Sequence, residues 1–310
     1  MLSQRKAELK KLLKERFKLP PDFLRRAGFT HSYANLVIEF LEFENSLDRD
    51  ELFWFRDIYA YMLFLRGKFK NAAPILENLL RHTPKNDVDK IKLLKFNLAL
   101  IYFQWSAELR YKRGVEKREK MSPKENETRQ EAEYIFKELL NLTKDDNNQL
   151  MIRILIGFAF FLAWKEEHGE AIKTFEKAFA LSKDRHLLWE EARCYDGIGV
   201  VYKMRSDFGR GLDYFDKALK IFSRVNDAGG IIESKHNIAL TSWDKDQKNH
   251  EEIKRVLESR FHYLITHGDP RVAAIICRNI RRVSRESGER GKEREYTSKE
   301  RGLRDEFELE

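Results

Sequence analysis

The sequence predicts an all-helical protein built from repeated helical hairpins. Its 310 residues include only 15 Gly and 6 Pro, while 42% are apolar and 35% are charged. Apolar and charged residues mix at short intervals, and this composition argues against a sheet-rich, fibrous or disordered chain. In several stretches, apolar and small residues recur at offsets of three and four, which is the spacing of one helical face. We therefore expect long helices that pack through repeated faces.

The segment before the repeats, residues 1–46, is expected to form three helices. Pro20 and Pro21 mark the first boundary between them, and Gly28 marks the second. Residues 1–30 contain nine Lys or Arg and three acidic residues, a net charge of +6, whereas the whole chain carries +8. The basic excess therefore belongs mainly to this segment.

This basic segment has two interpretations. Gly28, the hydroxyl of Thr30 and a helix from His31 resemble a helix-turn-helix, which predicts contacts with DNA phosphates. However, the expected recognition helix, residues 31–44, has three Glu and no Lys or Arg. A cap that covers the first repeat is therefore the competing interpretation. The candidate phosphate contacts are Lys10, Lys11, Lys14, Arg16, Lys18, Arg25 and Arg26.

The first repeat covers residues 53–84. Tyr59 and Leu63 share a helical face, a turn is expected at Gly67, and the second helix should stop before Pro84 because proline cannot continue a helix. A weaker repeat follows over residues 98–139. It is interrupted by a charged insertion, residues 112–127, which we expect to be a solvated loop with a break at Met121-Ser122-Pro123.

Two further repeats have the same order of large and small residues at a distance of 40 residues. One covers residues 155–178 and the other residues 192–222. In the second, Gly199 on the first helix and Gly211 on the second allow the two helices to pack closely. A degraded copy over residues 238–257 ends the array.

These motifs resemble the tetratricopeptide repeat (TPR) family. That family has an aromatic residue, Leu-Gly and Tyr on the first helix, and Ala, an aromatic residue and Ala on the second; here Tyr195, Gly199, Phe215 and Ala218 match. The spacing of 40 residues, compared with about 34 in most of the family, is similar to the long-helix subclass of kinesin light chains and bacterial peptide-pheromone receptors. The resemblance implies a right-handed superhelical solenoid over residues 47–268 that binds peptides.

Residues 269–310 are expected to cap the last repeat. An amphipathic helix is predicted over residues 270–287, and its apolar side is assigned to Val272, Ile275, Ile276 and Ile280. A charged helix or tail then runs to Glu310, and its basic and acidic blocks cancel.

The sequence has no motif for catalysis, a metal or a cofactor. A Gly-rich phosphate loop, G-x-S-x-G and H-E-x-x-H are absent, and the eight His are scattered. Cys194 and Cys277 belong to no metal-ligand pattern and are expected to be reduced, packed thiols. No apolar stretch approaches the roughly 20 residues of a membrane span. We expect a cytoplasmic, non-catalytic protein that binds no cofactor and no membrane.

The surface expected to bind a partner is the concave groove that the first helix of each hairpin lines. Aromatic rings provide contact area, Asn amides can pair with an extended peptide backbone, and Arg or Lys can bind a carboxylate. The resemblance implies that a groove Asn holds peptide backbone, and for each aromatic residue core packing is the competing interpretation. The candidate residues are Asn97, Phe103, Arg153, Phe160, Trp164, Arg193, Lys203, His236, Asn237 and Trp243.

Three hypotheses for function follow. The principal one is a TPR-like scaffold or adaptor that binds a peptide or protein segment in its groove. The alternative is a peptide-responsive, DNA-binding transcriptional regulator that uses the basic N-terminal segment. The third is a subunit of a larger assembly, such as a homodimer, held through the outer face or the terminal helices.

Overall fold

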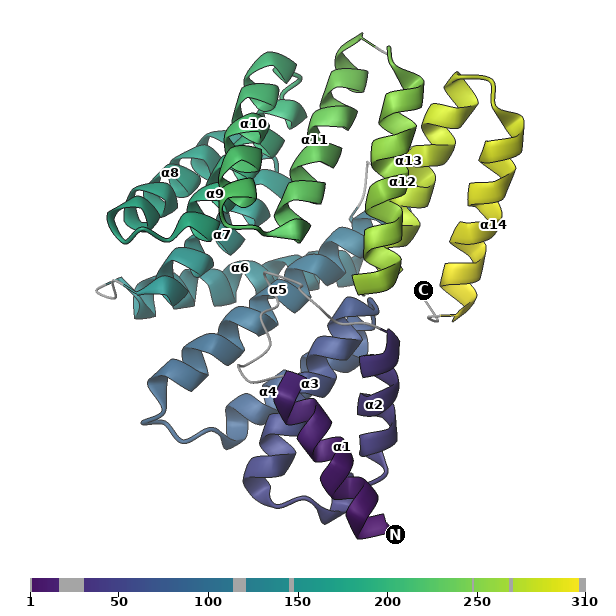
Figure 1. Ribbon diagram of the computed structural model, residues 1–310. Helices are drawn as coiled ribbons and strands as arrows, with labels where there is room; N and C mark the ends of the chain where they lie inside the picture. The colour runs from purple at the N-terminus through teal and green to yellow at the C-terminus, as the bar shows by residue number, and fades with distance from the viewer. Residues whose placement is uncertain are drawn as a thin grey trace. The chain divides into compact units, whose positions relative to one another are not determined.

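The computed structural model describes residues 2–16, 31–113, 121–144, 148–246, 248–267 and 270–306. The regular structure in these ranges is helical, which confirms the predicted class (Figure 1). A short 3₁₀ turn, η1, covers Glu44–Ser46. The α-helices are α1 (Leu2–Arg16), α2 (His31–Leu41), α3 (Arg49–Leu65), α4 (Phe69–His82), α5 (Val88–Arg113), α6 (Pro123–Leu142), α7 (Gln149–Trp164), α8 (His168–Asp184), α9 (Leu188–Met204), α10 (Phe208–Arg224), α11 (Ala228–Asp246), α12 (His250–His267), α13 (Pro270–Glu286) and α14 (Arg290–Glu306).

The chain divides into two compact units. The first comprises Met1–Ile135, Leu264–Val272 and Leu303–Glu310, and the second comprises Phe136–Tyr263 and Ala273–Gly302. The most regular repeats therefore belong to the second unit. The functional boundaries expected near residues 46 and 268 stay a prediction.

Consecutive helices pair as hairpins. In the first unit α3 packs on α4, and in the second unit α7 packs on α8 and α9 packs on α10 (Figure 1). These pairs are the repeats predicted over residues 53–84, 155–178 and 192–222, so all three are confirmed. The expected stop before Pro84 is confirmed as well, because α4 ends at His82.

One turn geometry joins the successive helices from α7 to α11. After the left-handed residue of each of these turns, an amide N–H bonds back to a carbonyl five residues earlier, as from Asp207 N to Tyr202 O at 2.9 Å. This is the Schellman motif, which satisfies carbonyls at a helix end. Each 40-residue repeat therefore consists of two helices, and each helix ends in one such turn. The left-handed residues lie 20 positions apart: Glu166, His186, Ser206 and Asn226.

Two glycines allow successive hairpins to approach closely. A Cβ added to Gly197 of α9 would lie 2.2 Å from the ring of Phe175 on α8. In the next repeat, a Cβ added to Gly230 of α11 would lie 2.3 Å from the ring of Phe222 on α10. Gly199, predicted to permit packing within its hairpin, does face the second helix of that hairpin. Bare backbone at these positions makes room for the buried rings.

The charged insertion contains less loop than predicted. Helix α6 begins at Pro123, so the expectation of a loop over residues 123–127 was wrong. The Ser122 side chain accepts a hydrogen bond from the backbone N–H of Glu125 at 3.1 Å, and proline suits the first position of a helix. The predicted break is therefore a helix start. Residues 114–120 lie outside the described residues.

Helix α13 confirms the predicted amphipathic helix, but its apolar face is rotated. Ile276 and Ile280 are buried, whereas Ile275 is 41% exposed, so the assignment of Ile275 to the apolar side was wrong. The buried face instead contains Cys277 and Val283, each three residues from the buried Ile280. The buried face of α13 is thus turned away from Ile275 and toward Cys277, relative to the predicted face.

Candidate functional site

A ladder of polar side chains links the first helices of successive hairpins in the second unit. Between α7 and α9, Arg153 Nε and Gln149 Nε2 donate to Glu190 Oε1 at 2.9 and 2.7 Å. Between α9 and α11, Arg193 Nη1 donates to Glu233 Oε2 at 3.0 Å. The partners lie 37 to 41 residues apart in the sequence. The polar ladder therefore follows the period of the repeats.

Asp196 lies at the centre of the polar ladder and is 1% exposed. Asn237 Nδ2 donates to its Oδ1 at 2.8 Å, and Arg193 Nη1 donates to its Oδ2 at 3.2 Å. Burial raises the pKa of the Asp196 carboxyl above its ordinary value. Burial alone would lower the pKa of Arg193, but the charges of Glu233 and Asp196 raise it, so the guanidinium stays protonated. The amide nitrogen of Asn237, expected to hold a peptide, is engaged within the protein.

Aromatic rings flank the two arginines. The Arg193 guanidinium carbon lies 5.2 Å from the ring centroid of Phe160, and that of Arg153 lies 5.6 Å from the ring of Trp189. Trp189 Nε1 donates to Asp227 Oδ2 at 3.0 Å, which fixes the orientation of the indole. Such stacking combines cation–π attraction with apolar contact. The predicted residues Arg153, Phe160 and Arg193 are thus brought together.

Core packing also accounts for part of the predicted aromatic set. Phe160 meets Phe175 of α8 edge-on at 5.0 Å between ring centroids, and the ring of Trp164 lies 6.0 Å from that of Phe161. Phe160 and Trp164 nevertheless keep partial exposure, so each ring can contact both the core and a ligand.

The remaining predicted residues of α9 and α11 are largely buried. Burial lowers the pKa of Lys203, although its ion pair with Asp244 at 3.1 Å opposes the shift. Burial and nearby cations hold the pKa of His236 well below its ordinary value, so this imidazole is neutral. Trp243 is buried, and the guanidinium carbon of Arg282 lies 4.3 Å from its ring centroid.

Asn97 and Phe103 lie on α5 in the first unit, and both are buried. They are therefore not members of the polar ladder, which begins with α7. The Nδ2 atom of Asn97 has no hydrogen-bond partner among the described residues.

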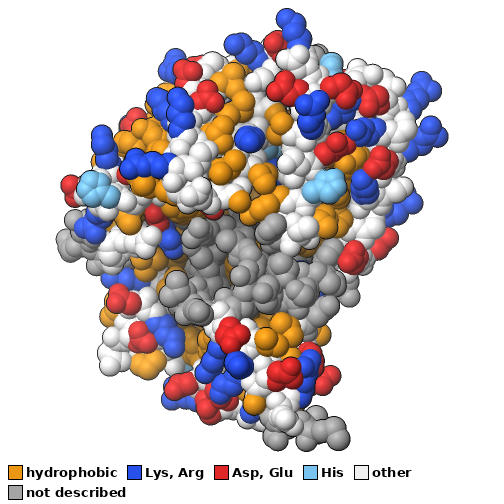
Figure 2. Space-filling model, viewed as in Figure 1, with side chains coloured by type: hydrophobic (Ala, Val, Ile, Leu, Met, Phe, Trp, Pro, Cys, Tyr) orange, Lys and Arg blue, Asp and Glu red, His pale blue; other side chains and the backbone are white. Residues whose placement is uncertain are grey.

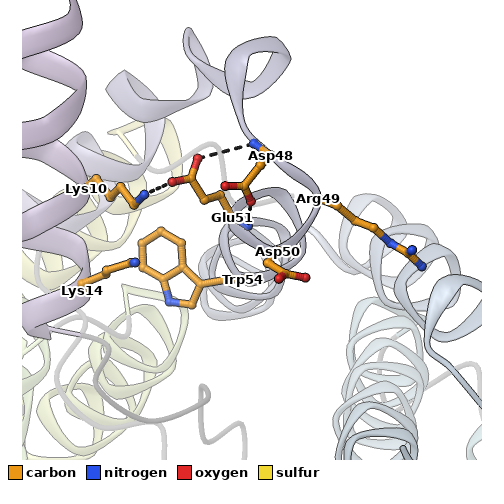
Figure 3. A pocket seen from close by; sticks show the side chains of 7 residues that line it. All are labelled: Lys10, Lys14, Asp48, Arg49, Asp50, Glu51 and Trp54. Carbon is orange, nitrogen blue, oxygen red and sulfur yellow. Dashed lines mark hydrogen bonds and ion pairs between the residues drawn. The ribbon is translucent and has the colours of Figure 1, made fainter. Parts of the chain in front are cut away.

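Two of the candidate phosphate contacts on α1 line a cavity of about 680 Å³ in the first unit (Figure 3). Lys10 forms an ion pair with Glu51, whose side chain also closes a capping box with Asp48 at the start of α3. The Lys14 ammonium lies 5.8 Å from the ring centroid of Trp54. Both lysines thus already contact the protein. Lys11 is exposed, whereas the side chain of Arg16 and residues Lys18, Arg25 and Arg26 lie outside the described part of the chain.

The described residues also bear on metal binding and membrane insertion. Basic and acidic side chains are interspersed over the face drawn in Figure 2. Within the described ranges, no three His, Cys, Asp or Glu side chains are grouped so that they could hold a metal ion. The helices in those ranges also lack the length and apolar content that crossing a membrane requires. Cys194 and Cys277 are buried free thiols, as predicted.

The sequence interpretation missed several members of the polar ladder. Projection of a single helix cannot find them, because each is defined by a partner one repeat away. An alignment of the sequence with itself at an offset of 40 residues would have placed Gln149 with Trp189, and Arg153 with both Arg193 and Glu233. The missed residues are Gln149, Trp189, Glu190, Asp196 and Glu233.

No protein-family model matches the sequence, and no curated protein matches it in sequence. Solved structures have a similar fold. A Rap protein complexed with Competence and Sporulation Factor is 11% identical, with a TM-score of 0.58 over 89% of this chain and 80% of that chain. Aspartyl phosphate phosphatase F from Bacillus subtilis is 14% identical, with a TM-score of 0.60 over 88% and 66%. The Rap conjugation gene regulator of the plasmid pLS20, in complex with the Phr* peptide, is 13% identical, with a TM-score of 0.54 over 80% and 76%. The fold is thus a TPR-like array of helical hairpins.

Proposed function

We propose that this protein is a non-catalytic adaptor that binds a peptide or protein segment along the polar ladder of α7, α9 and α11. The observation that carries the proposal is the burial of the carboxylates of Glu190 and Asp196, with the largely covered Arg193, where these helices meet. Buried ion pairs rarely stabilise a protein more than apolar side chains of the same size would. Charges retained at this cost, with the raised pKa values of Arg193 and Asp196, are typical of functional surfaces.

The exposed edge of the polar ladder suits a peptide ligand. Arg153 and Lys203 can bind carboxylates, and the half-buried rings of Phe160 and Trp164 can cover apolar side chains. Arrays of helical hairpins present such side chains along one extended surface. A peptide is also the ligand named for one structure of similar fold, the plasmid regulator in complex with Phr*.

Selection of peptides by the full chain tests this proposal. A phage-displayed random library is panned on the immobilised protein, and the affinity of each enriched peptide is measured by calorimetry. We expect the double variant Arg153→Ala, Trp164→Ala to bind these peptides at least about tenfold more weakly, a loss of about 1.4 kcal/mol.

The matched control is Tyr134→Ala on α6, an exposed aromatic residue outside the polar ladder. It should bind the enriched peptides as the unaltered chain does. A library that yields no peptide, or equal affinities for both variants, would remove the polar ladder as the binding surface.

A further inference from the structure

The second unit has a cavity of about 320 Å³ on α6, α7 and α8, away from the polar ladder. This volume is at the lower end of the roughly 300–1,000 Å³ of ligand pockets. The floor is apolar and consists of Leu140 of α6 with Met151, Leu155 and Phe158 of α7. Three lysines form the rim: Lys144, Lys173 and Lys177.

The rim is basic, and among the described residues no carboxylate lines the cavity. Lys173 Nζ lies 2.8 Å from Glu170 Oε1, but these side chains are 72% and 63% exposed. Solvent screens exposed pairs of this kind, so Lys173 can exchange its partner at little cost. Lys177 has no ion-pair partner within the described part of the chain. A carboxylate placed over the apolar floor would meet cations on two sides.

The next hairpin contains the same cleft in a filled form. At an offset of 40 residues, Leu155 corresponds to Tyr195 and Thr174, which lines the cavity, corresponds to Tyr214. The rings of the two tyrosines lie 6.0 Å apart between centroids. A leucine and a threonine thus line the cavity at the two positions where the next hairpin has aromatic rings in contact.

The charge of the rim also differs between the two hairpins. The counterparts of Lys144 and Lys173 are Asp184 and Asp213. The third rim lysine has a basic counterpart, Lys217, whose ammonium lies 4.6 Å from the ring centroid of Tyr214. The cleft of the next hairpin thus has two tyrosine rings and acidic residues at its rim. The cleft on α6, α7 and α8 is open and basic, although the two hairpins have the same arrangement of helices.

We propose that the open cleft binds an acidic segment of a partner protein, which inserts one large apolar side chain between flanking carboxylates. The cavity has room for a single such side chain over Leu155 and Phe158, and the methylene stems of the lysines extend its apolar wall. Lys173 and Lys177 stand one turn apart on α8, whereas Lys144 follows α6, so the rim offers cations on two segments to different carboxylates of the partner. Such charge complementarity selects the partner and speeds its association.

Calorimetric titration of the full chain with synthetic peptides tests this proposal. The probe is a twelve-residue peptide with one central Phe and two Glu on each side of it. One comparison peptide carries Gln in place of every Glu, and another carries Ser in place of Phe. We expect both comparison peptides to bind at least about tenfold more weakly than the probe, because each lacks one half of the recognised chemistry. Binding of the probe should also weaken as salt is added.

Variants locate the binding in the cleft. Lys173→Gln, Lys177→Gln should weaken binding of the probe about tenfold or more, and Lys217→Gln in the filled cleft should leave it within about twofold. Leu155→Tyr, Thr174→Tyr should abolish binding, since these tyrosines would fill the cavity as they do one hairpin later. Circular dichroism checks that each variant is folded. If the tyrosine variant unfolds, the affinities of the exposed lysine variants for the probe still test the proposal.

Three results would overturn the proposal. The first is equal binding of the Glu and Gln peptides, and the second is an equal effect of Lys173→Gln, Lys177→Gln and of Lys217→Gln on binding of the probe. The third is binding of 4-phenylbutyrate, a small anion with an aromatic ring, without binding of the probe, which would assign the cleft to a small amphipathic anion. The variant Arg153→Ala, Trp164→Ala should bind the probe normally, so failure at this cleft is distinguishable from failure at the polar ladder.

Discussion

Gly197 lies where α9 meets the ring of Phe175, and a Cβ added there would lie 2.2 Å from that ring. A contact this short does not persist, so Gly197→Ala must displace either the ring or the helix. Overpacking of this kind costs about 1–3 kcal/mol. We therefore expect the free energy of unfolding to fall by that amount, as measured by urea denaturation followed by circular dichroism.

Gly209 is the matched control, because it also lies in a helix, α10, but a Cβ added there would have nothing within 4 Å. Alanine favours a helix over glycine by about 0.5–1 kcal/mol. Gly209→Ala should consequently leave the free energy of unfolding unchanged or raise it. Equal losses in the two variants would show that the packing against Phe175 is not the reason for glycine at Gly197.

Asp57 of α3 is a buried carboxyl whose pKa is raised to about 7 by burial, against the opposing charge of Lys90. Its ordinary pKa is 3.8, so between these values the folded state holds a proton that the unfolded chain has lost. The contribution of Asp57 to stability must therefore fall as the pH rises from about 4 to about 7, and stay constant above that.

Replacement of this carboxyl by an amide should remove the dependence on pH. We expect Asp57→Asn to raise the free energy of unfolding by about 1–3 kcal/mol at pH 8 and to change it little at pH 4. Denaturation of both proteins at the two pH values measures the difference. The assignment to Asp57 fails if the gain is the same at both.

At the scale of the helices, the polar ladder connects hairpins through a buried carboxylate. Glu190 is 2% exposed and accepts hydrogen bonds from Gln149 and Arg153 one repeat earlier. Glu190→Ala removes the carboxylate to which the guanidinium of Arg153 donates. Loss of one partner from a buried ion pair is costly. We expect a loss of about 2–4 kcal/mol in the free energy of unfolding.

The exposed pair of Glu170 and Lys173 on α8 is the control for that loss. Glu170→Ala should change the free energy of unfolding by less than about 0.5 kcal/mol, because solvent screens this pair. Similar losses in the two glutamate variants, measured by thermal and urea denaturation, would mean that the polar ladder does not stabilise the contact between α7 and α9.

The helices and hairpins could be predicted because their signals are local. A large residue facing a small one at spacings of three and four defines each hairpin, and α7 to α10 contain the repeats predicted over residues 155–178 and 192–222. The polar ladder could not be predicted in this way. Glu190 and Glu191 are adjacent and identical in the sequence, yet Glu190 is buried and Glu191 is partly exposed. A projection of α9 places Glu190 on the buried face with Cys194, but it does not contain Gln149 and Arg153, the partners of this carboxylate from another repeat.

At the scale of the whole molecule, the net charge of +8 is concentrated near the N-terminus, since residues 1–30 carry +6. This concentration motivates the alternative proposal of DNA binding. Contact with each phosphate releases counterions, so the logarithm of the binding constant falls with the logarithm of salt concentration by about 0.9 per contact. The slope of that line therefore counts the cations that reach the duplex.

We expect weak binding to duplex DNA and a shallow slope, no steeper than about −3. Lys10 is already paired with Glu51, Lys14 lies against Trp54, and the helix from His31 carries no Lys or Arg with which to contact bases. Fluorescence anisotropy of a labelled duplex over a series of salt concentrations measures the slope. The comparison is the variant Lys11→Glu, Lys14→Glu. A slope steeper than about −5 that disappears in this variant would establish the N-terminal segment as a DNA-binding element and favour the regulator over the adaptor.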